Sequence, residues 1–138
     1  MKLIFSKALN YLYINAGQYR VAMSDFFFLK TTYISLGIAL LFNLLSWLLA
    51  IIIYRSLADS LAILHYNIIF GIDKIGEPIS LFQLPFIGLM LIVVNFFVSV
   101  LLVRKREQTP GHFLLLTGIL TNLILFVAIY LLYIINFS

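Results

Sequence analysis

Cysteine is absent from this 138-residue chain, and charged side chains make up only 10% of it. Without cysteine the chain can hold no disulfide, iron–sulfur cluster or thiolate zinc site. Because 64% of its residues are hydrophobic, it also lacks the polar surface that a soluble domain of this length needs. We therefore expect an all-α integral membrane protein in which residues 1–138 form a single membrane domain.

The chain also lacks ionisable side chains in the middle of its apolar stretches. Three apolar stretches are long enough to cross a bilayer core of about 30 Å, and none carries Asp, Glu, Lys, Arg or His at depth. Proton-coupled transport and intramembrane proteolysis need such groups. Phosphoryl transfer, the chemistry of small three-span lipid kinases, needs clustered carboxylates, and a Gly-rich phosphate loop is also missing. The sequence predicts no enzyme, no cofactor and no metal site.

The apolar stretches predict three transmembrane helices, at residues 33–54, 84–103 and 112–137. Residues 55–83 are expected to form a loop on the outer side, and residues 104–111 a short basic turn on the cytoplasmic side. In that turn Thr109 followed by Pro110 is typical of an N-cap and the first residue of a helix. The last two spans should thus form an antiparallel helix hairpin.

The positions of the basic residues predict the orientation. Seven of the nine Lys and Arg lie near the N-terminus or in the basic turn, and only Arg55 and Lys74 lie in the outer loop. This excess places the N-terminus inside and the C-terminus outside a cytoplasmic membrane. Arg104, Lys105 and Arg106 are predicted to set this topology and to contact anionic lipid. Because the cations flank the spans and form no patch, we expect no nucleic-acid partner.

Residues 1–32 are predicted to form an amphipathic segment that lies in the membrane interface. Leu3, Ile4 and Ala8 recur at roughly helical spacing, whereas Lys2 and Lys7 lie off that face. Polar residues interrupt the stretch, so it has no continuous apolar core of the kind that a signal peptide needs. The alternative is a partly disordered tail.

Small and weakly polar residues recur at helical spacing in the first two spans and predict faces where helices pack closely. The functional alternative is the lining of a pore. The predicted faces are Ser35, Ala39, Asn43, Ser46 and Ala50 in the first span, and Gly88, Ile92, Asn95 and Ser99 in the second.

One asparagine lies about 15 Å from the nearer end of each span, close to the middle of the membrane. Because an amide facing lipid would be unsatisfied, Asn43, Asn95 and Asn122 are expected to point inward and bond one another. They would then set helix register. The alternative is a polar site for an ion or small solute, which we disfavour because transport sites usually include an ionisable group. The whole predicted polar face comprises Asn43, Ser46, Asn95, Ser99, Thr121 and Asn122.

The outer loop is too apolar for a solvated segment. Residues 61–70 are mostly aliphatic or aromatic, yet too few to span a bilayer. They predict a short strand, a re-entrant segment or an interfacial helix resting on the bundle. A solvated turn is expected at residues 73–77; its carboxylates, Asp73 and Glu77, are too few for calcium, which prefers about six to eight oxygens. His65 is expected to be a buried, hydrogen-bonded imidazole and not a metal ligand.

The stretch from Leu64 to Asp73, Leu-His-Tyr-Asn-Ile-Ile-Phe-Gly-Ile-Asp, carries a family resemblance. It resembles a segment of small three-span membrane proteins of reduced-genome, candidate-phylum bacteria, in which the motif precedes a helix hairpin with a basic turn. The similarity covers residues 33–138. It implies a bacterial cytoplasmic membrane and an outer-face motif, but no chemistry, because that family has no assigned activity. The motif residues in this chain are His65, Tyr66, Asn67, Gly71 and Asp73.

Two classes of function remain. The first is a structural or accessory membrane protein that acts by helix packing and outer-loop contacts, in a homo-oligomer or with other membrane subunits. The alternative is an oligomeric passive channel or small-solute facilitator around the asparagine face; a phage holin is one version, although the usual charged cytoplasmic tail is lacking. A channel requires water along Asn43, Asn95 and Asn122, whereas an accessory protein leaves them dry.

Overall fold

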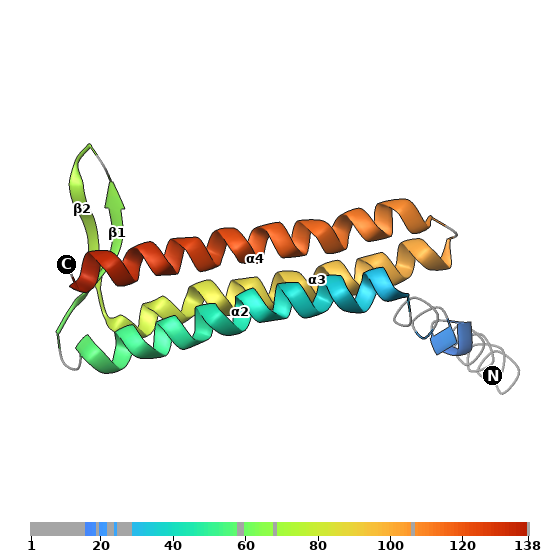
Figure 1. Ribbon diagram of the computed structural model, residues 1–138, viewed down its shortest axis with the longest axis horizontal. Coiled ribbons are helices and arrows are strands. Elements are labelled where there is room, and N and C mark those ends of the chain that lie inside the picture. The colour runs from blue at the N-terminus through green and yellow to red at the C-terminus, as the bar shows by residue number, and fades with distance from the viewer. Residues whose placement is uncertain are drawn as a thin grey trace, which may run out of the picture.

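The computed structural model describes residues 16–18, 20, 21, 24, 29–57, 60–67, 69–105 and 107–137. Three long helices run side by side as a bundle: α2 (Lys30–Leu57), α3 (Gln83–Arg104) and α4 (Gln108–Phe137) (Figure 1). Each lies in a stretch long and apolar enough to cross a membrane. The prediction of three helices of spanning length is confirmed. The interfacial segment predicted for residues 1–32 lies largely outside the described residues.

The turn between the last two helices is shorter than the predicted residues 104–111. The end of α3 is closed by Lys105 N and Glu107 N, which donate to Leu102 O over 2.9 and 3.0 Å. Helix α4 then begins at Gln108, so Thr109 is no N-cap and Pro110 lies within the first turn. Proline is tolerated there because the first N–H groups of a helix have no partner within it.

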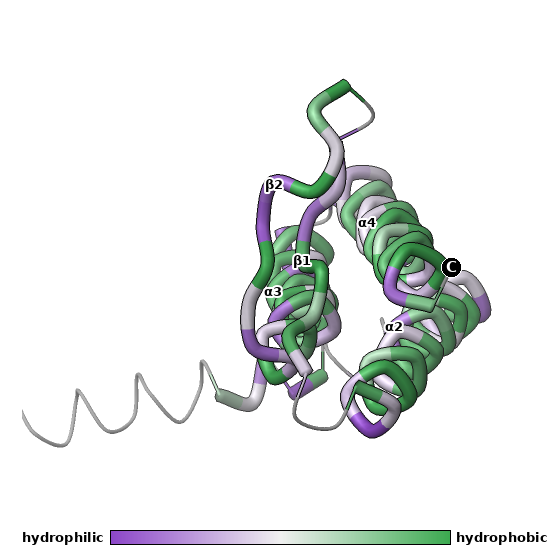
Figure 2. The backbone as a smooth tube through the Cα atoms, turned by 90° about the vertical axis from the view of Figure 1, so that its left-hand side faces the viewer, coloured by the Kyte–Doolittle hydropathy of each residue, from purple (hydrophilic) through white to green (hydrophobic). Residues whose placement is uncertain are grey.

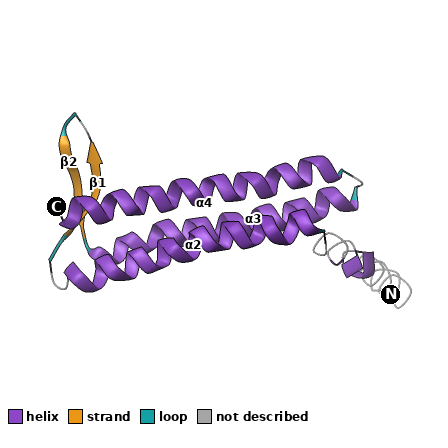
Figure 3. Cartoon of the chain, in the orientation of Figure 1, coloured by secondary structure: helices purple, strands orange, loops and turns teal. Residues whose placement is uncertain are grey.

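The outer loop forms a two-stranded antiparallel hairpin, β1 (Ala62–Asn67) and β2 (Gly71–Gly76). It projects sideways from the bundle at the end where the C-terminus lies, and a 3₁₀ helix, η1 (Pro78–Phe82), leads from it into α3 (Figures 1 and 3). The strand alternative is therefore correct and the interfacial helix is wrong. The turn predicted at residues 73–77 is also wrong, because Gly71 adopts a positive φ of 79° and reverses the chain earlier.

Small and polar residues occupy most of the buried positions between the helices, and the exposed residues are mostly large and apolar. Apolar residues predominate along all three helices (Figure 2). This arrangement suits lipid, in which close backbone approach and interhelical hydrogen bonds replace the hydrophobic drive of water. Most of the predicted packing faces are buried, but Ser35 and Asn95 are only half-buried. An aliphatic cluster at the hairpin end fixes the base of the hairpin; it consists of Ala50, Ile53, Ala62, Leu81, Ile129 and Leu132.

Candidate functional site

Two of the predicted asparagines form a buried contact at the centre of the bundle. Asn43 Nδ2, on α2, donates to Asn122 Oδ1, on α4, over 3.0 Å and to Pro85 O over 2.8 Å. Asn122 Nδ2 donates to Gly88 O over 3.3 Å and to Gly118 O over 3.0 Å. The two side chains are 3% and 1% exposed, and each amide nitrogen uses both of its hydrogens. We call the Asn43–Asn122 pair the amide clasp.

Gly88 on α3 allows the amide clasp to form. A Cβ at this position would lie 2.5 Å from Asn122 Oδ1 and 2.8 Å from Asn43 Nδ2, closer than real Cβ contacts come. The bare backbone of α3 therefore sits against both amides and supplies the Gly88 carbonyl as an acceptor. The clasp thus joins all three helices through two side chains and two α3 carbonyls.

Asn95 does not join the amide clasp, and the prediction that all three asparagines meet is wrong for this residue. Its Nδ2 donates over 3.3 Å to Thr117 Oγ1, on α4, beside a small cavity that residues of all three helices line. Because the two amides of the clasp bond to the carbonyls of Pro85 and Gly88, Gly88 and not Asn95 lies at the level of the clasp. Asn95 is seven residues further along, about 10 Å away at 1.5 Å per residue.

The hydroxyl groups of the predicted polar face have different partners. Ser99 is buried, and its Oγ is 2.7 Å from Asn95 O and 2.8 Å from Gly111 O, so it links α3 to α4. Ser46 Oγ donates over 2.9 Å to Phe42 O, and Thr121 Oγ1 over 2.8 Å to Thr117 O, each within its own helix. The six residues of the predicted face therefore do not act as one unit. Asn43 and Asn122 form the clasp, Ser99 and Asn95 each bond from α3 to α4, and the hydroxyls of Ser46 and Thr121 bond within their own helices.

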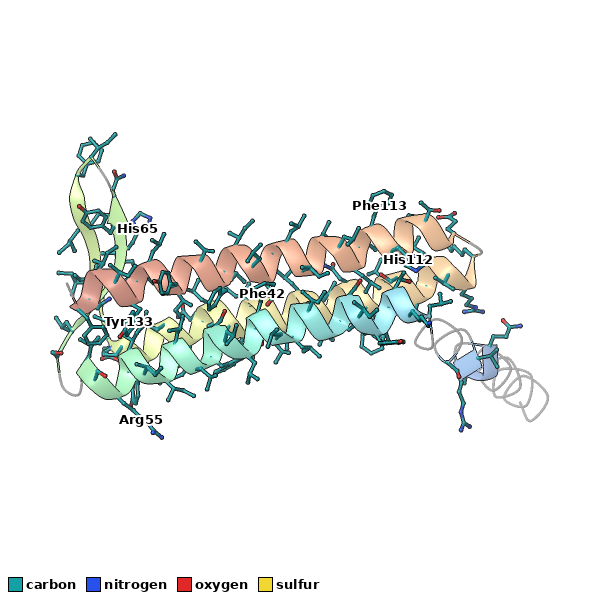
Figure 4. The ribbon with its side chains drawn as sticks, viewed as in Figure 1. Phe42, Arg55, His65, His112, Phe113 and Tyr133 are labelled. Carbon is teal, nitrogen blue, oxygen red and sulfur yellow. The ribbon has the colours of Figure 1, made fainter. Side chains whose placement is uncertain are left out.

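The motif residues of the outer loop shape the hairpin. His65 Nδ1 contacts Asp73 Oδ1 across the two strands at 2.5 Å, and Asn67 Oδ1 accepts a hydrogen bond of 2.8 Å from Ile69 N at the turn. Gly71 supplies the positive φ, and Tyr66 is exposed. The side chain of His65 is 60% exposed, so its predicted burial is wrong although it does have a partner (Figure 4).

Asn136, near the end of α4, fastens the hairpin to the bundle and was not singled out by sequence reasoning. Its Oδ1 accepts from Ile63 N over 2.8 Å, and its Nδ2 donates to Ile63 O over 3.0 Å. A side-chain amide thereby takes the place that a neighbouring strand's peptide would have beside β1. The only sequence signal is an asparagine at the end of an apolar helix, and it does not identify the partner.

The tip of the hairpin is apolar and free of contacts with the helices. Ile69 and Phe70 are 82% and 80% exposed, and both views of the chain place the tip beyond the edge of the bundle (Figures 1 and 2). Within the described residues, no three His, Asp or Glu side chains gather closely enough to hold a metal ion. Among the described residues, the tip of the hairpin is thus an exposed apolar surface.

Basic residues lie at the opposite end of the bundle. Arg104 Nη2 donates to Gln18 Oε1 over 2.9 Å, and His112 Nε2 shares a hydrogen bond of 2.8 Å with Thr31 Oγ1 (Figure 4). Lys105 is exposed in the turn, and the side chain of Arg106 lies outside the described residues. The two ends of the bundle thus differ: one carries the basic turn and the other carries the hairpin.

No protein family, curated protein or solved structure matches the chain. The resemblance of residues 64–73 to three-span proteins of candidate-phylum bacteria therefore stays a prediction.

Proposed function

We propose that this chain is a structural or accessory membrane protein without catalytic activity, and that it uses its hairpin to contact further membrane subunits or copies of itself. The observation that carries the proposal is the rigid base and apolar tip of the hairpin. Asn136 and the buried Ala62 fix the base, whereas Ile69 and Phe70 at the tip are 82% and 80% exposed. Apolar surface that is kept exposed in this way is typical of an interaction site.

The alternative, an oligomeric passive channel, would need its asparagines to line water. Asn43 and Asn122 are buried within a single chain, and all their side-chain N–H groups donate hydrogen bonds to protein acceptors. Opening a pore along them would break the three interhelical hydrogen bonds in a medium where unpaired polar groups are costly. This burial favours the accessory function over the channel.

We also propose that the basic end faces the cytoplasm and the hairpin end faces outward. The cation count supports this orientation, because Lys30, Arg104 and Lys105 lie at the end opposite the hairpin. A reporter fused to the C-terminus should then be active only in its extracytoplasmic form. Changing Arg104, Lys105 and Arg106 together to Gln should give a mixed orientation. A cytoplasmic reporter in the unaltered protein would contradict the proposal.

The function is tested by solubilising the full-length protein gently from its membranes and determining the mass of the intact assembly. We expect either stoichiometric foreign subunits or a defined self-oligomer. The double variant Ile69→Ser, Phe70→Ser should lose these partners, because it removes the apolar tip without touching the base. Ile79→Ser is the matched control, since Ile79 is also exposed, at 53%, at the same end of the bundle but outside the hairpin.

Retention of every partner by the tip variant would overturn the role of the hairpin. A pure self-oligomer that passes small solutes when reconstituted in vesicles would favour the channel. In that case Asn122→Leu should change the flux, because the channel requires this amide to face water.

A further inference from the structure

We propose that a groove at the hairpin end of the bundle binds the headgroup of an anionic phospholipid from the adjacent membrane leaflet. The groove has a volume of about 180 Å³ and lies between the hairpin, η1, α3 and α4. This lipid site is independent of the accessory role, because it lies at the base of the hairpin and not at its tip. The lining residues are Leu64, Lys74, Ser80, Leu81, Gln83, Leu84, Ile87 and Leu132.

The polar residues of the lining all lie at the hairpin end of the groove, beside Leu64 and Leu81, and only apolar residues line it further along the helices. Lys74, Ser80 and Gln83 lie at or before the start of α3, where they can reach a phosphate and its ester oxygens. Ile87 lies one turn further into the membrane, about 6 Å away at 1.5 Å per residue. A lipid has this same order, a polar headgroup followed by an acyl chain, whereas a soluble anion would gain nothing from the apolar half.

Lys74 supplies the charge complementarity. It is the one charged residue among those that line the groove, and no carboxylate in residues 29–57, 60–67, 69–105 or 107–137 forms an ion pair with it. The neighbouring Asp73 is engaged by His65. Arg55, the other cation at this end, points away from the bundle (Figure 4). An ammonium that pairs with none of the described carboxylates, and that lies beside a membrane surface, attracts anionic headgroups.

The size of the groove limits what it can hold. Pockets that enclose a whole drug-sized ligand are larger, at about 300–1,000 Å³. A volume of about 180 Å³ accommodates a phosphate with its glycerol, while the acyl chains remain in the bilayer against Ile87 and the flank of α3. The lipid would therefore be held by its headgroup and the first part of its chains.

Native mass spectrometry of the full-length protein, titrated with dioleoyl phosphatidylglycerol or dioleoyl phosphatidylcholine, tests this site. We expect one phosphatidylglycerol to bind before the others. Lys74→Gln should weaken its binding about fivefold, which corresponds to ~1 kcal/mol for one basic residue near the surface. Arg55→Gln is the matched control, because it removes the same charge at the same end of the bundle but outside the groove. Equal losses in the two variants would overturn the proposal.

A second pair of variants tests the apolar half without changing charge. Ile87→Trp should fill the groove and abolish the preferred site, whereas Val94→Trp, at another lipid-facing position of α3, should leave it intact. Glycerol 3-phosphate at millimolar concentration should not displace the bound lipid. Displacement by this soluble headgroup, or equal binding of the two lipids, would show that the groove holds no anionic phospholipid.

Discussion

Asn43 and Asn95 are both amides near the middle of spanning helices, yet their surroundings differ. Asn43 is buried, and with Asn122 it makes three hydrogen bonds between helices, which join all three. Asn95 is half-exposed and makes one bond of 3.3 Å to a threonine hydroxyl. The difference arises on the opposing helix surface. Gly88 lets the backbone of α3 come close to the first pair, whereas Asn95 borders a small cavity between the three helices. The level of an amide along the neighbouring helices and the residue that faces it there together decide its partners.

The largest effect should come from closing the space that Gly88 leaves. Gly88→Ala places a methyl group 2.5 Å from Asn122 Oδ1 and 2.8 Å from Asn43 Nδ2. We expect the free energy of unfolding in bicelles, measured by steric trapping, to fall by about 2–3 kcal/mol, the upper range for overpacking. Gly118→Ala is the control, because its Cβ would meet Asn95 Nδ2 at an ordinary 3.5 Å. Equal stability of the two variants would show that the clasp is not tightly packed.

Asn122→Leu should have the next largest effect. It removes the acceptor of Asn43 and both bonds that Asn122 donates. Interhelical bonds in membranes contribute about 0.6 kcal/mol on average, so we expect a loss of about 1–2 kcal/mol. In a double-mutant cycle with Gly88→Ala the two losses should not add, because both variants disrupt the same clasp. If the two losses of unfolding free energy added, Gly88 and the two amides would stabilise the bundle independently of each other.

Asn136→Leu should act locally. It removes the two bonds to the backbone of Ile63, so we expect the base of the hairpin to open while the three helices stay packed. The Ile63 amide should lose protection from hydrogen exchange by about tenfold, which corresponds to roughly 1.4 kcal/mol. Amides near the middle of α2 serve as the internal reference. Unchanged exchange at Ile63 would mean that the aliphatic cluster alone fixes the hairpin.

The sequence predicted the spanning helices and most packing faces because both follow from local patterns. Apolar length defines a span, and small residues at helical spacing define the side that backbones approach, as at Ala39 and Ser99. The partners of the amides could not be predicted in the same way. Pairing Asn43 with Asn122 depends on how three helices align, and that alignment depends on where each helix begins.

The hairpin shows the same limit. Its apolar run predicted a strand as one alternative, but the reversal depends on the positive φ of Gly71, and the position of β1 depends on Asn136, 73 residues from Ile63 along the chain. His65 was expected to be buried because its neighbours are apolar. In a two-stranded hairpin that stands away from the bundle, apolar neighbours provide no burial, so the imidazole stays exposed beside Asp73.

The smallest effect should come from Asn95→Leu. The variant removes only the 3.3 Å bond to Thr117 Oγ1, and that hydroxyl keeps its 2.8 Å bond to Leu114 O, so no polar group is stranded. We expect the free energy of unfolding of the single chain to fall by no more than about 0.6 kcal/mol. A loss as large as that of Asn122→Leu would contradict the contrast between the two sites. The variant could instead dissociate a self-oligomer while the free energy of unfolding of the single chain stayed constant. Asn95 would then make its main contacts between chains, because a partly exposed amide in lipid gains from a hydrogen bond to a second copy.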